Sequence, residues 1–366
     1  MATRTIFAKC HCAAVHFSIT VPVASLPLGV HLCHCSVCRT THGSYTCFHA
    51  PLPGGVRPVF AAPSSLESTT TGYQYAAAAC TRYFCKTCGC HIGDEDYEEG
   101  KTLENPEWRI ASSLFGPGLH DDGKPDQFFM LRSHVFTNSA PSGFYEWLPK
   151  VGSRELVKWN PRPGDAFYPP AADDPYEPSA AEHDADGREV LRASCHCGGV
   201  SFTIARPADC VGESASTCRS PELPDRWLAC LDTCDDCRLV DGAHAIGWAE
   251  VPLASLVPQV TADLELGTLK RYVSSQDAMR AFCGVCGATV FYRSLTTSGA
   301  NVDVATGLLR APEGVTAHRW LHWRNGRIVH LESGQRYHAD FANSLADGFQ
   351  AWVAKVYEDT MSHKDS

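Results

Sequence analysis

Alternating apolar and polar residues mark two short segments that lie far apart in the chain. They read KCHCAAVHFSIT and SCHCGGVSFTIA, and each begins with a Cys-x-Cys pair. Every second residue after the pair is apolar: Val15, Phe17 and Ile19 in the first segment, and Val200, Phe202 and Ile204 in the second. A period of two residues is typical of a strand with one buried face. We therefore expect two equivalent strands, each directly after a pair of cysteines.

The end of the chain has a helical pattern instead. In ADFANSLADGFQAWVAKVYED, apolar residues recur at steps of three and four, at Phe341, Leu345, Phe349, Trp352, Val353 and Val356. This spacing predicts an amphipathic helix that packs on a core. The other segments are short and broken by glycine and proline, so the fold class is expected to be mainly β.

Three motifs occur twice and in the same order. After the Cys-x-Cys segments come LCHCSVCRTTHG and LDTCDDCRLVDG, and then RYFCKTCGCHIG and RAFCGVCGATVF. Cys10 and Cys195 of the first motif lie 185 residues apart, whereas Cys38 and Cys237 of the second lie 199 apart. The second copy therefore gained residues between these motifs, and the Ser and Pro content of CVGESASTCRSPELPD predicts that they form a loop.

The duplication implies two domains. Between the copies lies NPRPGDAFYPPAADDPYEPSAAEHDADGRE, which is rich in proline, alanine and acidic residues and predicts an extended linker. We expect a first domain at residues 1–159, a linker at 160–189 and a second domain at 190–366. The predicted architecture is two tandem small β domains with a C-terminal helix.

Composition and charge exclude some classes of partner. The chain has 366 residues, of which 44% are apolar and 20% are charged, with a net charge of −10. It contains no apolar stretch long enough to span a bilayer and no block of lysine and arginine, so neither a membrane nor a nucleic-acid partner is expected. The first residues, MATRTIFAKC, lack the apolar core of a signal peptide, which favours a cytoplasmic protein.

Nineteen cysteines indicate metal chemistry, because disulfides are rare in a reducing cytosol. Four thiolates close a tetrahedral zinc site, whereas three ligands leave a position for water or substrate. In the first copy the two outer pairs would supply four ligands, Cys10, Cys12, Cys85 and Cys88, and the middle motif three more, Cys33, Cys35 and Cys38. Spacing alone leaves open which of these cysteines share an ion.

The second copy differs in its middle motif. Its outer pairs supply Cys195, Cys197, Cys283 and Cys286, but Asp232 stands in the position of Cys33, ahead of Cys234 and Cys237. Aspartate is a zinc ligand in other proteins and is also a common turn residue. Asp232 is therefore either a ligand of a second open site or a loop residue of a site that has been lost.

The order and spacing of the three motifs resemble the glutathione-dependent formaldehyde-activating enzyme family, which also includes centromere protein V. The resemblance extends over each copy almost end to end, including VDVATGLL after the Cys-x-x-Cys-Gly knuckle of the second copy. It implies a small β fold in which the outer pairs hold a structural zinc and the middle motif a catalytic zinc. It also implies three zinc ions per chain, or four if Asp232 is a ligand.

Other polar residues near the motifs have several interpretations. Arg39 and Arg238 follow the middle motif in both copies, where they could bind a carboxylate of a glutathione-like substrate or pair with the negative metal shell. His42 and His244 are expected to be solvated loop residues. The histidines between ligand cysteines, His11, His34 and His196, are expected to point away from the ion. The remaining cysteines are expected to be small buried residues, with Cys230 a substitute ligand if Asp232 is not one: Cys47, Cys80, Cys90, Cys210, Cys218 and Cys230.

The function that the resemblance implies is that of a zinc-dependent carbon–sulfur lyase acting on an adduct of glutathione or another small thiol. Two alternatives remain. One is a zinc-binding scaffold without enzymatic activity, and the other is a zinc enzyme that hydrolyses or decarboxylates a specialised metabolite. The absence of a basic tail favours the enzyme over a chromatin-associated scaffold.

Overall fold

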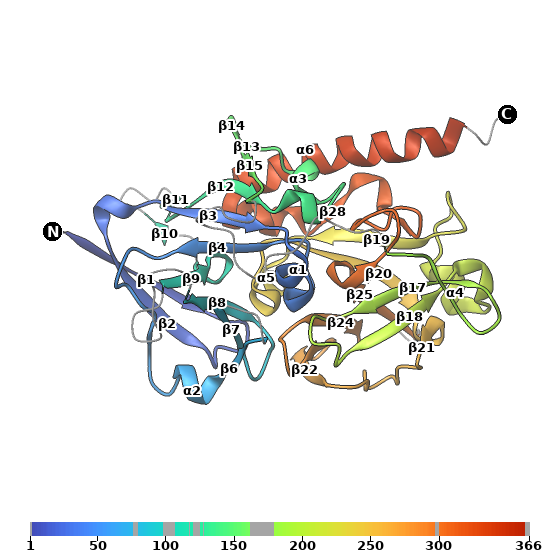
Figure 1. The fold of residues 1–366 in the computed structure, drawn as a ribbon, viewed down its shortest axis with the longest axis horizontal. Coiled ribbons are helices and arrows are strands. Elements are labelled where there is room, and N and C mark those ends of the chain that lie inside the picture. The colour runs from blue at the N-terminus through green and yellow to red at the C-terminus, as the bar shows by residue number, and fades with distance from the viewer. Residues whose placement is uncertain are drawn as a thin grey trace.

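Two β-rich halves lie side by side in the computed structural model, and one long helix crosses the top of both (Figure 1). The structure describes residues 2–75, 80–97, 107–116, 118–119, 125–126, 128–161, 179–296 and 300–362. The mainly β fold class is confirmed, because each half is built on one large and one smaller sheet. Within these residues, no helix combines the length and the apolar character that a membrane span needs.

The first half contains an eight-stranded sheet in the order β15-β12-β3-β4-β9-β8-β7-β6. Its strands are β3 (Leu28–Cys33), β4 (Cys47–Pro51), β6 (Thr70–Tyr73), β7 (Cys80–Cys85), β8 (His91–Asp96), β9 (Glu107–Ala111), β12 (Phe129–Val135) and β15 (Val157–Trp159). β12 runs parallel to β3 and to β15, and the other neighbours are antiparallel.

Smaller elements complete this half. A three-stranded sheet contains β1 (Thr3–Lys9), β2 (His16–Pro22) and β5 (Val59–Phe60), and two short hairpins contain β10 (Gly118–Leu119) with β11 (Pro125–Asp126) and β13 (Lys150–Val151) with β14 (Arg154–Glu155). The helices are α1 (Ser36–His42), α2 (Leu66–Thr69) and α3 (Phe144–Trp147), with 3₁₀ turns η1 (Val23–Ser25), η2 (Ser112–Leu114) and η3 (Thr137–Ser139).

The large sheet of the second half repeats the strand order of the first. Its path is β22-β23-β24-β25-β20-β19-β27, with β28 also pairing with β19. The strands are β19 (Trp227–Asp232), β20 (Ile246–Pro252), β22 (Leu269–Ser275), β23 (Ala278–Cys283), β24 (Thr289–Ser294), β25 (Asn301–Ala305), β27 (Leu321–His322) and β28 (Ile328–Val329). β19 and β20 thus occupy the places of β3 and β4, and β23 and β24 those of β7 and β8.

The smaller sheet of the second half contains β16 (Glu182–His183), β17 (Glu189–Ser194), β18 (Ser201–Ala205), β21 (Leu256–Val257) and β26 (Leu309–Arg310). Its helices are α4 (Glu213–Cys218), α5 (Asp235–Asp241) and α6 (Leu331–Ser362), with turns η4 (Pro207–Asp209), η5 (Leu253–Ser255), η6 (Thr306–Leu308) and η7 (Arg324–Gly326). The added segment between the first two motifs is not only a loop, because α4 forms within it.

The two strands predicted after the Cys-x-Cys pairs are present as β2 and β18. In β2 the side chains of Phe17 and Ile19 are fully buried, Ser18 between them is half-buried, and His16 and Thr20 on either side are exposed. In β18 the intervening Thr203 is also buried. The alternation is therefore sharper in the first half.

The predicted C-terminal helix is α6, which begins earlier than its apolar pattern and is bent at His338. It packs on both halves: Phe341 meets Phe48 of β4, and Phe349 lies 4.8 Å from Trp147 of α3, centroid to centroid. At Gly348 any side chain would collide with the backbone oxygen of Trp147. The helix therefore belongs to the whole molecule, although the sequence placed it in the second domain.

The halves share one continuous cluster of buried apolar side chains. Of the expected linker, residues 162–178 lie outside the described residues. Its end is not extended linker, since β16 pairs with β17 in the sheet of the second half. The molecule is thus two similar units joined through a common core.

Candidate metal centres

The structure gathers fourteen residues into four groups whose potential ligand atoms all lie within 4.8 Å of one another. The groups are Cys10, Cys12, Cys85 and Cys88; Cys195, Cys197, Cys283 and Cys286; Cys33, Cys35 and Cys38; and Asp232, Cys234 and Cys237. These are the sets that the family resemblance implies. Each half therefore has one group of four potential ligands and one of three.

The four-cysteine group of the first half connects the turn after β1 with the turn between β7 and β8. The sulfurs of Cys10 and Cys12 are 3.5 Å apart, and those of Cys12 and Cys85 are 3.6 Å apart. A zinc ion with Zn–S bonds of about 2.3 Å would separate its sulfurs by about 3.8 Å at tetrahedral angles. The backbone N–H of Val15 also donates to Cys10 Sγ. This donor set fits a closed zinc site.

The four-cysteine group of the second half has the same geometry. Cys195 and Cys197 are separated by 3.6 Å, and Cys197 and Cys283 by 3.5 Å, sulfur to sulfur. The backbone N–H groups of Val200 and Gly199 donate to two of these sulfurs, and the Thr268 hydroxyl lies 3.1 Å from a third. Such donors stabilise negative charge on clustered thiolates.

The three-cysteine group lies where β3 ends and α1 begins. Cys33 is the last residue of β3, and Cys35 caps α1 by accepting the backbone N–H of Cys38 at 3.4 Å. The positive end of a helix favours a thiolate. In addition, hydrogen bonds from the thiols of Cys33 and Cys35 hold the pKa of Cys38 well below its usual value. The sequence therefore folds into a small, negatively charged cluster at a helix start.

The corresponding group in the second half joins β19 to α5. Asp232 ends β19, and its carboxylate accepts the backbone N–H of Cys234 at 2.7 Å and lies 3.5 Å from Cys237 Sγ. Cys234 caps α5 by accepting the N–H of Cys237 at 3.2 Å. The carboxylate thus lies beside both sulfurs, in the position that Cys33 has in the first half.

An arginine that the sequence analysis missed contacts each of these smaller groups. Arg82 of β7 lies 4.0 Å from Cys38 Sγ, and Arg280 of β23 lies 3.5 Å from Cys237 Sγ. Both precede the third motif by the same spacing, in RYFC and RAFC. The shared arginine was visible in the sequence, but its contact depends on how the β-sheets fold over the helix start.

Each short helix is anchored to the opposite half at its end. Gly43 and Gly242 follow α1 and α5 with φ of +86°. A Cβ atom at Gly43 would lie 2.1 Å from the carbonyl oxygen of Thr289, and one at Gly242 would lie 2.4 Å from that of His91. Only glycine permits both the left-handed turn and this close approach. In the view of Figure 1 both helices lie near the centre of the molecule.

The arginines that follow the middle motifs reach across the same junction. Arg39 Nη1 donates to the carbonyl of Gly307 at 3.3 Å, and Arg238 Nη1 donates to that of Ser113. Arg238 also pairs with Asp235 at 2.8 Å. Both side chains are buried. In this arrangement they hold the two halves together, and a substrate carboxylate would have to compete with these contacts.

The histidines between ligand cysteines have partners other than a metal. His11 Nδ1 lies 2.6 Å from the hydroxyl of Tyr272, and His196 Nδ1 lies 2.7 Å from that of Tyr73. His34 Nε2 lies 2.9 Å from His134 Nδ1. In the described part of the chain, no histidine belongs to the four groups.

The expectation that His42 and His244 are solvated is wrong. Both are buried, and burial lowers the pKa of each well below its usual value. His42 stacks on His91 with ring centroids 3.8 Å apart, and His244 Nε2 lies 2.9 Å from the hydroxyl of Ser112. They were misjudged because their covering comes from distant strands and from the other half.

The cysteines outside the motifs fall into two classes of exposure. Four are buried, namely Cys47, Cys80, Cys90 and Cys218, while Cys210 and Cys230 are partly exposed. Cys230 is not part of the group that contains Asp232. Cys47 is unlike the others, because it packs in one small buried cluster with Cys35 and Cys38.

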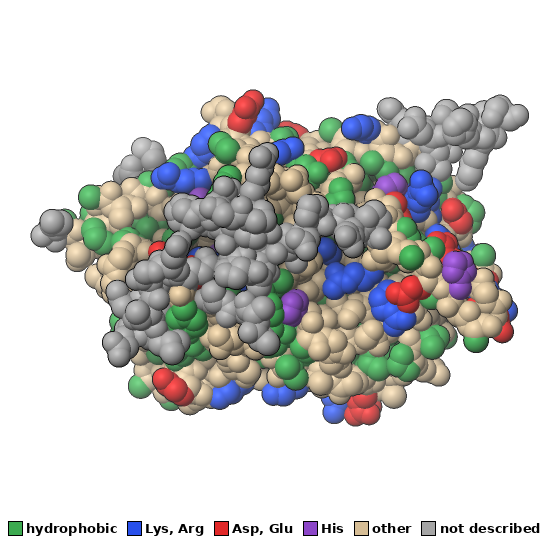
Figure 2. Space-filling view, viewed as in Figure 1, with side chains coloured by type: hydrophobic (Ala, Val, Ile, Leu, Met, Phe, Trp, Pro, Cys, Tyr) green, Lys and Arg blue, Asp and Glu red, His purple; other side chains and the backbone are tan. Residues whose placement is uncertain are grey.

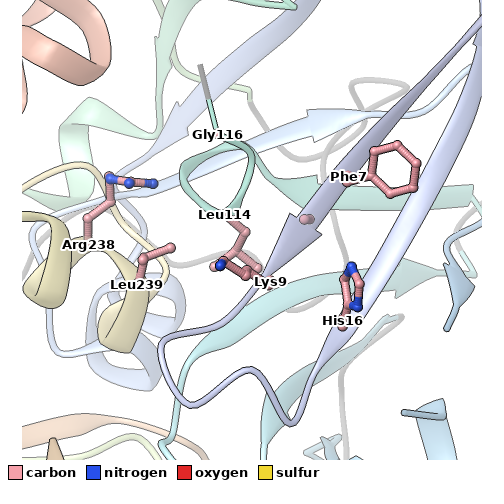
Figure 3. Close-up of a pocket in the computed structure, with 8 residues that line it drawn as sticks. Phe7, Lys9, His16, Leu114, Gly116, Arg238 and Leu239 are labelled. Carbon is pink, nitrogen blue, oxygen red and sulfur yellow. The ribbon is translucent and has the colours of Figure 1, made fainter. Parts of the chain in front are cut away.

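A pocket of about 180 Å³ lies at the junction between β1, η2 and α5, and no cysteine lines it (Figure 3). It is lined by Phe7, Ala8, Lys9, His16, Leu114, Gly116, Arg238 and Leu239. This pocket is smaller than most ligand sites, which usually enclose about 300 Å³ or more. On the described part of the face in Figure 2, basic and acidic side chains are interspersed.

Comparison with known proteins finds a family match in the first half of the chain. Residues 5–106 match the family model described as glutathione-dependent formaldehyde-activating enzyme. No curated protein matches the chain. The matched range contains all seven motif cysteines of the first half. This part of the chain is therefore similar to a family of glutathione-linked, zinc-binding enzymes.

Proposed function

We propose that this protein is a zinc-dependent carbon–sulfur lyase that acts on an adduct of glutathione or another small thiol. We further propose that its second half, which lies outside the family match, is a second copy of the same domain. The repeated motifs and the equal order of strands support this duplication. The observation that carries the function is the pair of three-ligand groups, each at a helix start and each beside a buried or half-buried arginine.

The number of ligands divides the roles of the four groups. The two four-cysteine groups are structural, because four thiolates complete a tetrahedral shell. The candidates for the catalytic site are the two three-ligand groups, Cys33, Cys35 and Cys38 in the first half and Asp232, Cys234 and Cys237 in the second. A zinc ion held there would supply a Lewis acid that lowers the pKa of a thiol and polarises the oxygen of its adduct.

The reaction joins or separates a thiol and an aldehyde. In the forming direction the thiol sulfur attacks the carbonyl carbon, and the thiol proton passes to the carbonyl oxygen. In the breaking direction the hydroxyl proton returns to sulfur as the C–S bond opens. Arg82 and Arg280 carry positive charge beside the sulfurs, so they are placed to orient an anionic substrate group and to offset the charge of the cluster.

The test is the rate of exchange between free glutathione and its formaldehyde adduct, followed by NMR with the zinc-loaded protein. We expect faster exchange than without protein, and a loss of at least tenfold in a double variant, Cys35→Ser with Cys234→Ser. Cys218→Ser, which removes a buried thiol outside the four groups, is the matched control. Exchange at the uncatalysed rate with glutathione and with other small thiols would exclude the lyase and favour a scaffold.

A further inference from the structure

A fourth cysteine accompanies the three-ligand group of the first half. Cys47 begins β4 and lies directly opposite Cys33 in the antiparallel β3–β4 pair. Residues paired in this way have their Cβ atoms within about 4.5–5.5 Å. The side chain is 2% exposed, so its thiol faces the interior of the cluster and not solvent.

The contacts of Cys47 are with the candidate ligands themselves. Cys47 packs in a small buried cluster with Cys35, Cys38 and Val37, and Cys33 packs against the same cluster. The sulfurs of Cys33, Cys35 and Cys38 lie within 4.8 Å of one another. A movement of Cys47 toward Cys35 would complete a set of four sulfurs.

The second half lacks this thiol at the same place. There Asp232 is opposite Ile246, in the register that pairs Cys33 with Cys47. Ile246 is 1% exposed and offers no ligand atom. The two halves therefore differ at both members of this cross-strand pair. The first half has two thiols there, whereas the second has a carboxylate and an apolar side chain.

We propose that Cys47 is a fourth metal ligand that closes the middle site of the first half, so that the position for substrate lies in the second half. The inference about Cys47 stands on these contacts, and only its consequence for catalysis rests on the proposed function. Under this proposal, the middle site of the first half is structural. Asp232, Cys234 and Cys237 then hold the ion that acts on substrate, with Arg280 beside them.

The ligand assignment is tested by NMR of the cadmium-loaded wild-type protein, in which four-thiolate sites resonate apart from sites with fewer sulfurs. We expect three four-thiolate resonances, from the two outer sites and the site with Cys47. Cys47→Ser should remove one of them, Ile246→Cys should shift the fourth resonance toward higher sulfur content, and Cys218→Ser should change nothing. Only two four-thiolate resonances in the wild type would overturn the proposal, even if Cys47→Ser does not fold.

The catalytic consequence has its own readout. If the substrate position lies in the second half, Cys234→Ser should lower the rate of exchange of the glutathione adduct far more than Cys35→Ser does. The reverse pattern, together with three four-thiolate resonances, would show that Cys47 is displaced by substrate and would overturn the placement in the second half. Wild-type protein that lacks exchange activity but shows three such resonances would contradict the proposed function and leave Cys47 as a ligand.

Discussion

Asp232 shows how a single carboxylate can keep the geometry of a thiolate site. One of its oxygens accepts the N–H of Cys234, and the other faces Cys237 Sγ. A turn aspartate would need only the first contact. The second contact places an oxygen beside the sulfurs, which is the arrangement expected of a ligand.

We therefore expect Asp232→Ala to lower the zinc content by one ion per chain, because a group of two cysteines cannot hold the ion alone. Asp232→Cys should retain that ion, since it restores three thiolates. Elemental analysis of the purified variants measures both results. Asp236→Ala, which changes an exposed carboxylate in the same segment, is the control. Equal zinc content in wild type and Asp232→Ala would show that the residue is not a ligand.

His91 should make the protein sensitive to acid. Its Nε2 donates to the carbonyl of Thr41 at 2.7 Å, and burial lowers its pKa to about 3. An unfolded histidine has a pKa of about 6.5, so below that pH the unfolded chain binds a proton that the folded chain excludes. Stability is therefore complete above pH 6.5 and falls as the pH decreases, by about 1.4 kcal/mol per unit for this group.

The measurement is the free energy of unfolding by urea between pH 7 and pH 5. His91→Gln keeps an N–H donor for Thr41, and its dependence on pH should be shallower than that of the wild type by about the slope given above. His16→Gln, at an exposed position of β2, should match the wild type. Parallel curves for His91→Gln and the wild type would show that His91 titrates normally in the folded state.

The residues that the sequence revealed are those whose partners are close in the chain. Cys35 and Cys38 meet because they start one helix, so their spacing alone brings them together. Cys47 meets Cys33 only through the register of two strands, and nothing local indicates it. His42 is covered by His49 and His91 of distant strands, and this covering could not be inferred from the polar residues around it.

At the scale of elements, the knuckle between β7 and β8 and the helix start at α1 have different tasks. The knuckle is a short turn of the large sheet, and its cysteines lie beside those of the turn after β1. The helix start is held in place by β3 and by its glycine end even without a metal. Loss of an ion should therefore lower the free energy of unfolding more at the knuckle than at the helix start.

Cys88→Ser should unfold or strongly destabilise the protein, because binding of a structural zinc contributes on the order of 10 kcal/mol to folding. Cys35→Ser should fold and lack an ion at the helix start. Thermal melts together with zinc content separate the two outcomes, and Cys90→Ser, a buried thiol next to the knuckle, is the matched control. Similar melts for Cys88→Ser and Cys35→Ser would show that the knuckle and the helix start contribute equally to folding.

Periodicity predicted β2, β18 and the apolar part of α6, because each has one face against the core. It did not predict that β12 returns to lie parallel to β3, or that β27 and β28 do the same beside β19. These strands are short or follow long connections. Their pairing depends on which sheet edge is left free, and that is a property of the assembled fold.

At the scale of the whole molecule, the halves contact each other through equivalent pairs. The N–H of His11 donates to Leu239 and that of His196 donates to Thr40, each at 3.1 Å. The contacts of each of these histidines with a tyrosine of the other half repeat the same relation. Such mutual contacts are typical of a symmetric dimer. Here both partners belong to one chain, so the Cys-x-Cys turn of each half also stabilises the junction between the halves.

The common core predicts that neither half is stable alone. Trp147 is fully buried, and its ring lies 5.4 Å from Trp323 and 5.3 Å from Trp352, centroid to centroid. Both partners belong to the second half. Trp147→Ala should therefore reduce the free energy of unfolding by about 3–5 kcal/mol, whereas Trp159→Ala, at a side chain that is 38% exposed, should cost less than about 1 kcal/mol.

Separation of the halves tests the same point more severely. A chain of residues 1–161 retains all seven motif cysteines of the first half, but it lacks α6 and the backbone carbonyl that Arg39 binds. We expect it to bind zinc at its outer cysteines and yet to give a poorly dispersed amide NMR spectrum, because the apolar surface around Trp147 is exposed to water. Addition of residues 179–366 should restore dispersion if the junction is self-complementary. A well-dispersed spectrum for residues 1–161 alone would show that the first half is an independent domain and that the shared core is not needed for its fold.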